Sequence, residues 1–344
     1  MAFKSVDNSW SGLYAQYIII KALYAMDTVE KGIVALDTDI KKVFTIDRLD
    51  LTDPLSPSQA IPTQQPGSGW TMDTRTMTPA NFQTFQVANP RDLESTVWSK
   101  YLAKPILEEI IPTGGPDLSG KMVQILLGRS GEQIENMFWM GSTAYQGHYV
   151  WGQPQYQLQY FNGYLQRMVN DPLVNLSTIT PAALTNTTVF AVLDDLIEQA
   201  GSLYQALITD KNSQRDMKFL CNVRTWILYK QQLANTQFKG GPLDERGTPT
   251  WKGWEVVPIA GMPKDTIVFT MSSTDPNIGN LHVAMNSEAD WNLRIGQLDG
   301  NIFAEQYAML AKWKFDVNYG WSDMIFLYTT LTANSFLPPV VTPQ

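Results

Sequence analysis

The longest regular pattern of hydrophobic and polar positions runs from residue 117 to residue 140. On a helical wheel with 100° per residue, one group of positions lies within about 60° of Val123. Its members are Leu126, Leu127, Ser130, Ile134, Met137, Phe138 and Gly141. The positions on the opposite side are Lys121, Gly128, Glu132 and Glu135. The pattern predicts one long helix that packs along a single stripe, with Gly128 off that stripe.

A second pattern, with a period of two residues, begins at Ile40. The segment KKVFTIDRLDL alternates as a strand does, and GWTMDTRTMTPANFQTFQVA, which starts at Gly69, is extended as well. Between them, DPLSPSQAIPTQQPGSG is too rich in proline and glycine for regular structure. The sequence therefore predicts a long hairpin over residues 40–87. A lone strand pair is marginally stable in water, so we expect this hairpin to pack on a neighbour.

Shorter patterns fill the rest of the chain. Helices are predicted over residues 10–30, 91–103 and 186–207. Short segments rich in β-branched and aromatic residues predict strands. These segments are KFLCNV, WEVVPIA, DTIVFTM, LHVAM, WNLRIGQ and MIFLYTTL. The mixture predicts an α+β protein.

The amino-acid composition indicates contacts with other protein molecules. With 344 residues, 44% of them hydrophobic and 17% charged, the chain is well outside the disordered range and long enough for about two modules. It has 11 Trp, 14 Tyr, 14 Phe and 14 Met, the residue types that are enriched where protein surfaces meet. We therefore expect part of the surface to contact other protein molecules.

Charge and cysteine content exclude other classes. The net charge is −8, and the longest basic run is the pair Lys41 and Lys42, so direct nucleic-acid binding is disfavoured. The single cysteine, Cys221, cannot form an internal disulfide, which fits a reducing compartment and a buried core position. The apolar run 17–26 is too short for a membrane span and contains Lys21. We expect no export signal and no membrane anchor.

One segment is similar to a phosphate-binding loop. GPDLSGKM fits the spacing G-x-x-x-x-G-K from Gly115 to Lys121, but Met122 stands where magnesium binding needs Ser or Thr. Pro116 removes a backbone donor, and Asp117 places a carboxylate where the anion would bind. The favoured interpretation is a capped helix start. A nucleotide-binding enzyme that uses Lys121 remains the weaker alternative.

Other catalytic or metal-binding patterns are weak. His148 and His282 have no second His or Cys at ligand spacing. The acid pairs at 108–109 and 194–195 point about 100° apart on a helix and do not converge. We expect no catalytic residue, no metal site and no cofactor.

The order of these parts resembles one family. IENMFWMG closes the long helix, FNGYLQRM follows it, a helix over 187–207 precedes KFLCNVRTWILY, and WKGWEVVPIAGMP and NLHVAMN come before the last strands. In order and local texture, most of the chain is similar to the tailed-phage major capsid proteins of the Hong Kong ninety-seven fold. The resemblance implies an α+β phage major capsid fold with an N-terminal arm, an extended β-hairpin loop, a peripheral domain with a long spine helix, and an axial domain.

The resemblance also implies domain boundaries. They are an arm over 1–39, an extended hairpin loop over 40–87, a peripheral domain over 88–145 with its spine helix at 117–140, an axial domain over 146–298, and a return to the peripheral domain with a C-terminal tail over 299–344. Many family members carry a long N-terminal scaffolding segment, whereas this chain begins almost at the arm. We therefore expect scaffolding to be separate, absent or already lost.

The function implied is structural. Copies of the chain would assemble through pentamers and hexamers into an icosahedral shell that encloses the double-stranded DNA of a tailed phage. Further partners would be portal, scaffolding and decoration proteins, with weak DNA contact at most and no membrane. The location would be the virion capsid, assembled in the host cytoplasm. An encapsulin-like compartment shell, which shares the fold, is the alternative.

Five aromatic or Met residues are candidates for contacts between subunits. They are Trp10, Tyr14, Trp70, Met72 and Trp139. The first four lie on segments with little local core, and the fifth lies off the apolar stripe of the long helix. Gly128 and Gly131 carry a separate hypothesis: they let another chain approach the helix, or let the helix bend as a shell matures. The competing interpretation, glycines tolerated in a well-packed helix, is equally open.

Overall fold

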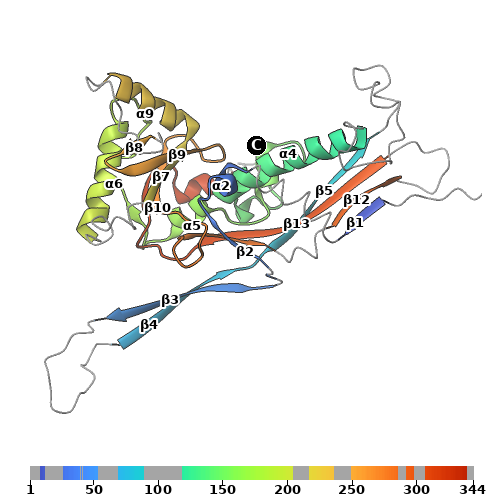
Figure 1. Ribbon diagram of the computed structural model, residues 1–344, viewed down its shortest axis with the longest axis horizontal. Helices are drawn as coiled ribbons and strands as arrows, with labels where there is room; N and C mark the ends of the chain where they lie inside the picture. The colour runs from blue at the N-terminus through green and yellow to red at the C-terminus, as the bar shows by residue number, and fades with distance from the viewer. Residues whose placement is uncertain are drawn as a thin grey trace, which may run out of the picture.

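In the part of the chain that the structure describes, two six-stranded sheets and one two-stranded ribbon form the framework (Figure 1). The computed structural model describes residues 8–11, 26–38, 40, 42–52, 69–88, 118–203, 217–235, 249–285, 292–297 and 307–338. Helices pack on both sheets, so the protein is α+β, as predicted.

The first sheet is organised around one long strand. Its members are β1 (Asn8–Ser11), β2 (Ala35–Asp37), β5 (Ala80–Ala88), β11 (Leu281–Met285), β12 (Asn292–Gln297) and β13 (Tyr307–Tyr319). β12 and β11 pair with the two ends of β13 along one edge, and β5 pairs along the other edge. The parallel pair β2–β11 extends the sheet further. The N-terminal part of the chain is thus joined to its C-terminal part.

The long helix α4 (Leu118–Met140) runs beside β5 and β13 (Figure 1). Its start lies within one residue of the prediction and its end coincides with it. Ile134, Met137 and Phe138, which belong to the predicted stripe, are fully or almost fully buried. Around the end of the helix pack α5 (Tyr164–Asn170) and the short helices η2 (Thr143–Tyr145) and η3 (Pro154–Leu158). A first core forms between these helices and the first sheet.

The buried surface of α4 is wider than the predicted stripe. Glu135 and Trp139 were expected away from the core, yet they are 3% and 0% exposed. The short helix α2 (Asp27–Glu30) covers this side, and its Thr28 hydrogen-bonds to both side chains. Because α2 is distant in sequence, the periodicity of α4 alone gave no sign of this second contact.

The second sheet carries its own core. Its strands are β6 (Asn175–Leu176), β7 (Met217–Asn222), β8 (Thr250–Trp251), β9 (Trp254–Ile259), β10 (Thr266–Met271) and β14 (Phe326–Thr329). The helices α6 (Val189–Leu203) and α9 (Val223–Asn235) pack against it. Phe219 and Phe269 stack with ring centroids 4.2 Å apart, and Cys221 is buried beside them, as predicted.

The sheet pairing differs from the predicted division at 146–298 and 299–344. β11 and β12 were assigned to the axial part but pair with β13 in the first sheet. Conversely, β14 pairs with β10 and β6 in the second sheet. The segment 307–329 therefore forms two strands, β13 and β14, in different sheets. A short apolar strand looks the same in sequence whichever sheet it joins, so the prediction had no basis for separating them.

The hairpin is shorter than predicted. β3 (Phe44–Thr52) and β4 (Gly69–Met77) pair over nine residues, from Phe44 opposite Met77 to Thr52 opposite Gly69. The chain then breaks at Thr78 and Pro79, and β5 joins the first sheet instead of continuing to residue 87. Proline removes a backbone donor and disfavours continued pairing. The predicted hairpin tip, 53–68, lies outside the described residues.

Two other predicted elements have mixed outcomes. The helix predicted over 10–30 is wrong at its start, because Trp10 and Ser11 belong to β1. At its other end, α2 covers only Asp27–Glu30. The helix predicted over 91–103 lies outside the described residues. None of the helices described is long and apolar enough to cross a membrane.

Candidate functional site

The hairpin of β3 and β4 leaves the body of the molecule (Figure 1). It exposes large apolar side chains. Trp70 is 67% exposed and Met72 is 63% exposed. They are two residues apart on one strand, so they lie on the same face of the ribbon. Both had been predicted to lack burial within their own chain. Exposed large apolar side chains that lie side by side are typical of surfaces that contact another molecule.

The other three predicted interface residues have three different locations. Trp10 lies in β1, whose backbone pairs with β12, and Tyr14 lies outside the described residues. Trp139 was wrongly predicted as an interface residue, because its side chain is enclosed in its own chain. The Trp139 Nε1–H donates to Thr28 Oγ1 at 3.0 Å, and its ring centroid lies 5.3 Å from that of Tyr164. It is therefore a core residue.

The two helix glycines lie in different surroundings. Gly128 is exposed, and a Cβ built on it meets nothing within 4 Å. Gly131 is buried. The glycine that packing requires is instead Gly141, where a Cβ would lie 2.5 Å from the Phe161 carbonyl oxygen. Gly163 closes the same contact, because its N–H donates to the Gly141 carbonyl at 2.9 Å. Sequence reasoning missed this pair.

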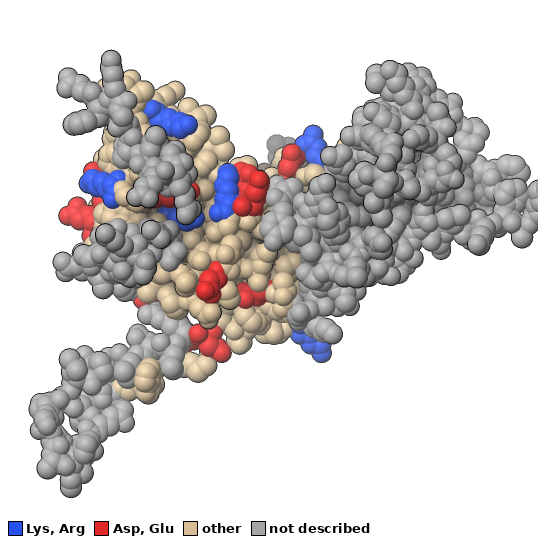
Figure 2. Space-filling model, viewed as in Figure 1, with Lys and Arg blue, Asp and Glu red and all other residues tan. Residues whose placement is uncertain are grey.

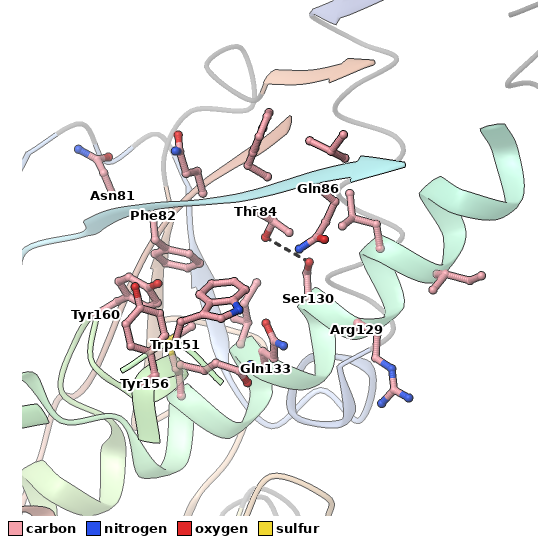
Figure 3. A pocket seen from close by; sticks show the side chains of 18 residues that line it. Asn81, Phe82, Thr84, Gln86, Arg129, Ser130, Gln133, Trp151, Tyr156 and Tyr160 are labelled. Carbon is pink, nitrogen blue, oxygen red and sulfur yellow. Dashed lines mark hydrogen bonds between the residues drawn. The ribbon is translucent and has the colours of Figure 1, made fainter. Parts of the chain in front are cut away.

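A groove of about 920 Å³ lies between β5 and α4, with the loop around Trp151 as its third wall (Figure 3). Its aromatic wall is layered: Phe82 stacks on Tyr160 at 5.2 Å, and Trp151 meets Tyr156 at 5.5 Å. Several apolar side chains of this region are exposed, namely Phe85, Val87, Ile125, Val150 and Trp151. The amides of Gln83, Gln86, Gln133 and Gln157 also line it. The groove combines apolar area with hydrogen-bonding groups, as protein contact surfaces do.

A buried carboxyl group holds α2 against α4. Glu135 Oε1 accepts a short hydrogen bond from Thr28 Oγ1, and Oε2 accepts from the Thr28 N–H at 3.4 Å. Burial raises the pKa of Glu135 to about 7, and the nearby charge of Asp27 adds to this, although the hydrogen bonds act in the opposite direction. The group thus titrates near neutrality while it joins two elements far apart in sequence.

The described residues offer little for catalysis. They contain no cluster of three metal-ligating side chains. His282 is buried, and its Nδ1 lies 2.9 Å from Asp37 Oδ2 across the β2–β11 pair. Burial raises the pKa of the Cys221 thiol to about 12, which disfavours the reactive thiolate. Leu118 to Lys121 are already helical, whereas a phosphate cradle needs a loop before its lysine. The segment from Gly115 to Asp117 lies outside the described residues.

Surface charge adds no basic patch on the face shown in Figure 2. There, the described Lys and Arg side chains are interspersed with Asp and Glu. Two mixed pairs are Arg129 with Glu132 and Lys252 with Asp194. Such a surface does not concentrate positive charge along a path for a phosphate backbone.

Comparison with known proteins identifies the fold. No family model and no curated protein matches the sequence. Among solved structures, a capsid chain of cyanophage A-1(L) matches with a TM-score of 0.56 and 11% identity, covering 89% of this chain and 93% of that one. A chain of the satellite phage P4 procapsid matches with a TM-score of 0.54 and 12% identity, covering 92% and 99%.

A third similar structure is not a phage capsid. The SrpI encapsulin of Synechococcus elongatus matches with a TM-score of 0.51 and 9% identity, covering 87% of this chain and 86% of that one. The chain therefore has the fold of phage capsid proteins, the Hong Kong ninety-seven type predicted from its sequence, and encapsulins share that fold.

Proposed function

We propose that this protein is a major capsid subunit that assembles with copies of itself into an icosahedral shell around the double-stranded DNA of a tailed phage, without catalysis. The main support is the similarity to phage capsid folds, which covers about nine-tenths of the chain. The hairpin that projects from this fold, with Trp70 and Met72 exposed, adds to it. Shell subunits need repeated heterologous contacts, and a projecting element supplies buried area without a larger core.

The parts of the fold take matching roles in this proposal. α4 is the spine helix, the first sheet with α4 and α5 is the peripheral domain, and the second sheet with α6 and α9 is the axial domain that meets its copies in pentamers and hexamers. β3 and β4 form the extended loop. Portal, scaffolding and decoration proteins are further partners. The mature location is the virion capsid, with assembly in the host cytoplasm.

The groove between β5 and α4 is the proposed receiving surface for a neighbouring subunit. Its exposed Phe85, Val87 and Ile125 need cover, as do Trp70 and Met72 on the hairpin. A contact between two different surfaces of identical chains is heterologous and repeats around a ring. Gly128, exposed on the same helix, leaves room for a neighbour's backbone, and this remains a hypothesis for that residue.

Imaging tests the proposal directly. Purified protein should form closed shells in negative-stain micrographs, and replacing both Trp70 and Met72 with alanine should reduce shell yield at least tenfold. The free subunit should unfold at an unchanged denaturant concentration, since neither side chain is buried in it. Leu173→Ala is the matched control, because Leu173 is 62% exposed on the body. Full shell yield from the double variant would contradict the role of the hairpin, and a wild-type protein that stays monomeric would contradict the function.

The encapsulin likeness supports a second candidate, a protein compartment shell. The contents of purified particles distinguish a phage capsid from a compartment shell. Nuclease-protected double-stranded DNA inside particles from the native source supports the capsid. A copurifying cargo enzyme in place of DNA supports the compartment. The proposed DNA contact is weak, so particles of the isolated protein should also form without nucleic acid.

A further inference from the structure

The base of the hairpin is fastened to the body by a set of directed polar contacts. Arg75 of β4 donates from Nη2 to Asp171 Oδ2 at 2.7 Å and to Ser322 Oγ at 2.9 Å. Its guanidinium carbon also lies 4.7 Å from the centroid of the Tyr319 ring. The Tyr319 hydroxyl donates to the same Asp171 Oδ2 at 2.9 Å. One side chain of the hairpin thereby contacts the end of α5, the end of β13 and the loop after it.

A second set of contacts holds the chain where it leaves the hairpin. The Thr78 N–H donates to Asp316 Oδ2 at 2.7 Å, and Arg167 donates to Asp316 Oδ1 at 2.8 Å. Asn318 Nδ2 donates to the Thr76 carbonyl at 3.0 Å. Asp316 therefore links the hairpin exit to α5 through β13, beside the Arg75 contacts.

Apolar contacts underneath are less directional. Met77, Ile40 and Ala284 form a small buried cluster, with Phe44 and Ile46 packed against it. Apolar burial favours contact but not one angle, whereas hydrogen bonds weaken steeply when they are misaligned. The direction of the hairpin is therefore set mainly by the polar contacts, and the apolar cluster keeps its base in place.

The polar groups are buried enough for their loss to matter. The exposed fractions of the side chains are 21% for Arg75, 12% for Asp171 and 4% for Asp316. Although burial alone would raise it, the pKa of Asp171 is lowered by hydrogen bonds from Leu173, Arg75 and Tyr319. Removing one partner leaves a partly buried charge uncompensated, which is far more disruptive than losing an exposed ion pair.

We propose that Arg75, Asp171, Tyr319, Ser322 and Asp316 form an orientation latch that fixes the direction of the hairpin relative to the body. A nine-residue strand is roughly 30 Å long, so a turn of about 10° at its base moves its far end by about 5 Å. That exceeds the tolerance of a packed contact. If the proposed function holds, the latch also sets the angle between neighbouring subunits and hence the curvature of the shell.

Distance measurements on unassembled subunits test the latch without reference to shells. Spin labels are placed at Met72→Cys on the hairpin and Ile227→Cys on α9, both exposed, while the native Cys221 is buried and unlabelled. Arg75→Ala should at least double the width of the distance distribution. Arg75→Lys should give an intermediate width, because lysine keeps the charge but not the planar fork. Arg129→Ala, an exposed arginine on α4, should leave the width unchanged.

Each outcome has a separate meaning. An unchanged distribution in both Arg75 variants would overturn the latch, and Arg75→Lys keeps the test decisive if the alanine variant does not fold. Particle diameters measured by electron microscopy then test the consequence for curvature. Arg75→Ala should broaden the range of diameters, and wild-type diameters alongside a widened distance distribution would remove the link to curvature. A wild-type protein that forms no particles would overturn the proposed function and leave the latch standing.

Discussion

The body of the molecule buries a tryptophan, whereas the hairpin leaves one exposed to solvent. Trp139 in the body is 0% exposed and hydrogen-bonded, whereas Trp70 on the hairpin is 67% exposed. The body closes two cores with its own side chains. The hairpin has only a small apolar cluster at its base. The body therefore holds its structure as a single molecule, while the hairpin exposes apolar side chains that contribute to neither of these two cores.

Paired tryptophan substitutions give the largest contrast. Trp139→Ala should lower the free energy of unfolding of the free subunit by about 3–5 kcal/mol, because it opens a cavity and removes the donor to Thr28. Trp70→Ala should change it by no more than about 0.5 kcal/mol. Urea denaturation of unassembled subunits measures both. Equal losses would mean that the hairpin tryptophan is packed in its own subunit after all.

A pH series probes the junction between α2 and α4 inside the body. Because the pKa of Glu135 is raised from 4.5 to about 7 in the folded state, the folded protein binds a proton that the unfolded chain has released between these values. The associated stability is present in full below about pH 4.5 and is lost as the pH rises to about 7. The total effect is roughly 3 kcal/mol.

Substitution at this position isolates that effect. Glu135→Gln keeps a hydrogen-bonding group beside Thr28 but does not titrate, so the unfolding free energy should lose most of its slope between pH 4.5 and pH 7. Glu132→Gln, exposed on the same helix, should keep the wild-type slope. Denaturation curves at several pH values provide the measurement. An unchanged slope in Glu135→Gln would assign the pH dependence to other groups.

A substitution at Gly128 on α4 should have the smallest effect and the opposite sign. Gly128→Ala should raise the free energy of unfolding by up to about 1 kcal/mol, because alanine is the better helix former and the position is open. Gly141→Ala, the control, should be destabilising, since its Cβ would collide with the Phe161 carbonyl. Thermal unfolding of the free subunit resolves the two signs. Destabilisation by Gly128→Ala would show that this face is already in close contact.

Parts of this structure were predictable because their signals are local. The bounds of α4 follow from a long unbroken helical period, and Met77 was correctly placed in an extended segment flanking a proline-rich tip. The exposure of Trp70 and Met72 followed from the same reasoning, since a two-stranded ribbon cannot bury both of its faces. The order of such elements was enough to suggest the fold.

What was missed depends on contacts between distant segments. Trp139 and Glu135 fall off the main stripe of α4, and they are buried by segments distant in sequence, among them α2. The predicted hairpin was too long because β5 pairs with β13, which lies more than 200 residues later in the chain. The groove lined by Phe82 and Trp151 likewise brings together three segments. The apolar residues at 149–151, between Gly147 and Gly152, were a local hint in the sequence.

The first sheet also bears on the timing of synthesis. β1 pairs with β12, and β12 pairs with β13, so the opening residues of the chain must wait for strands near its end. Pairings of such long sequence separation form slowly, and the ribosome supplies their partners last. A nascent polypeptide thus cannot complete its first sheet until β12 and β13 have been translated.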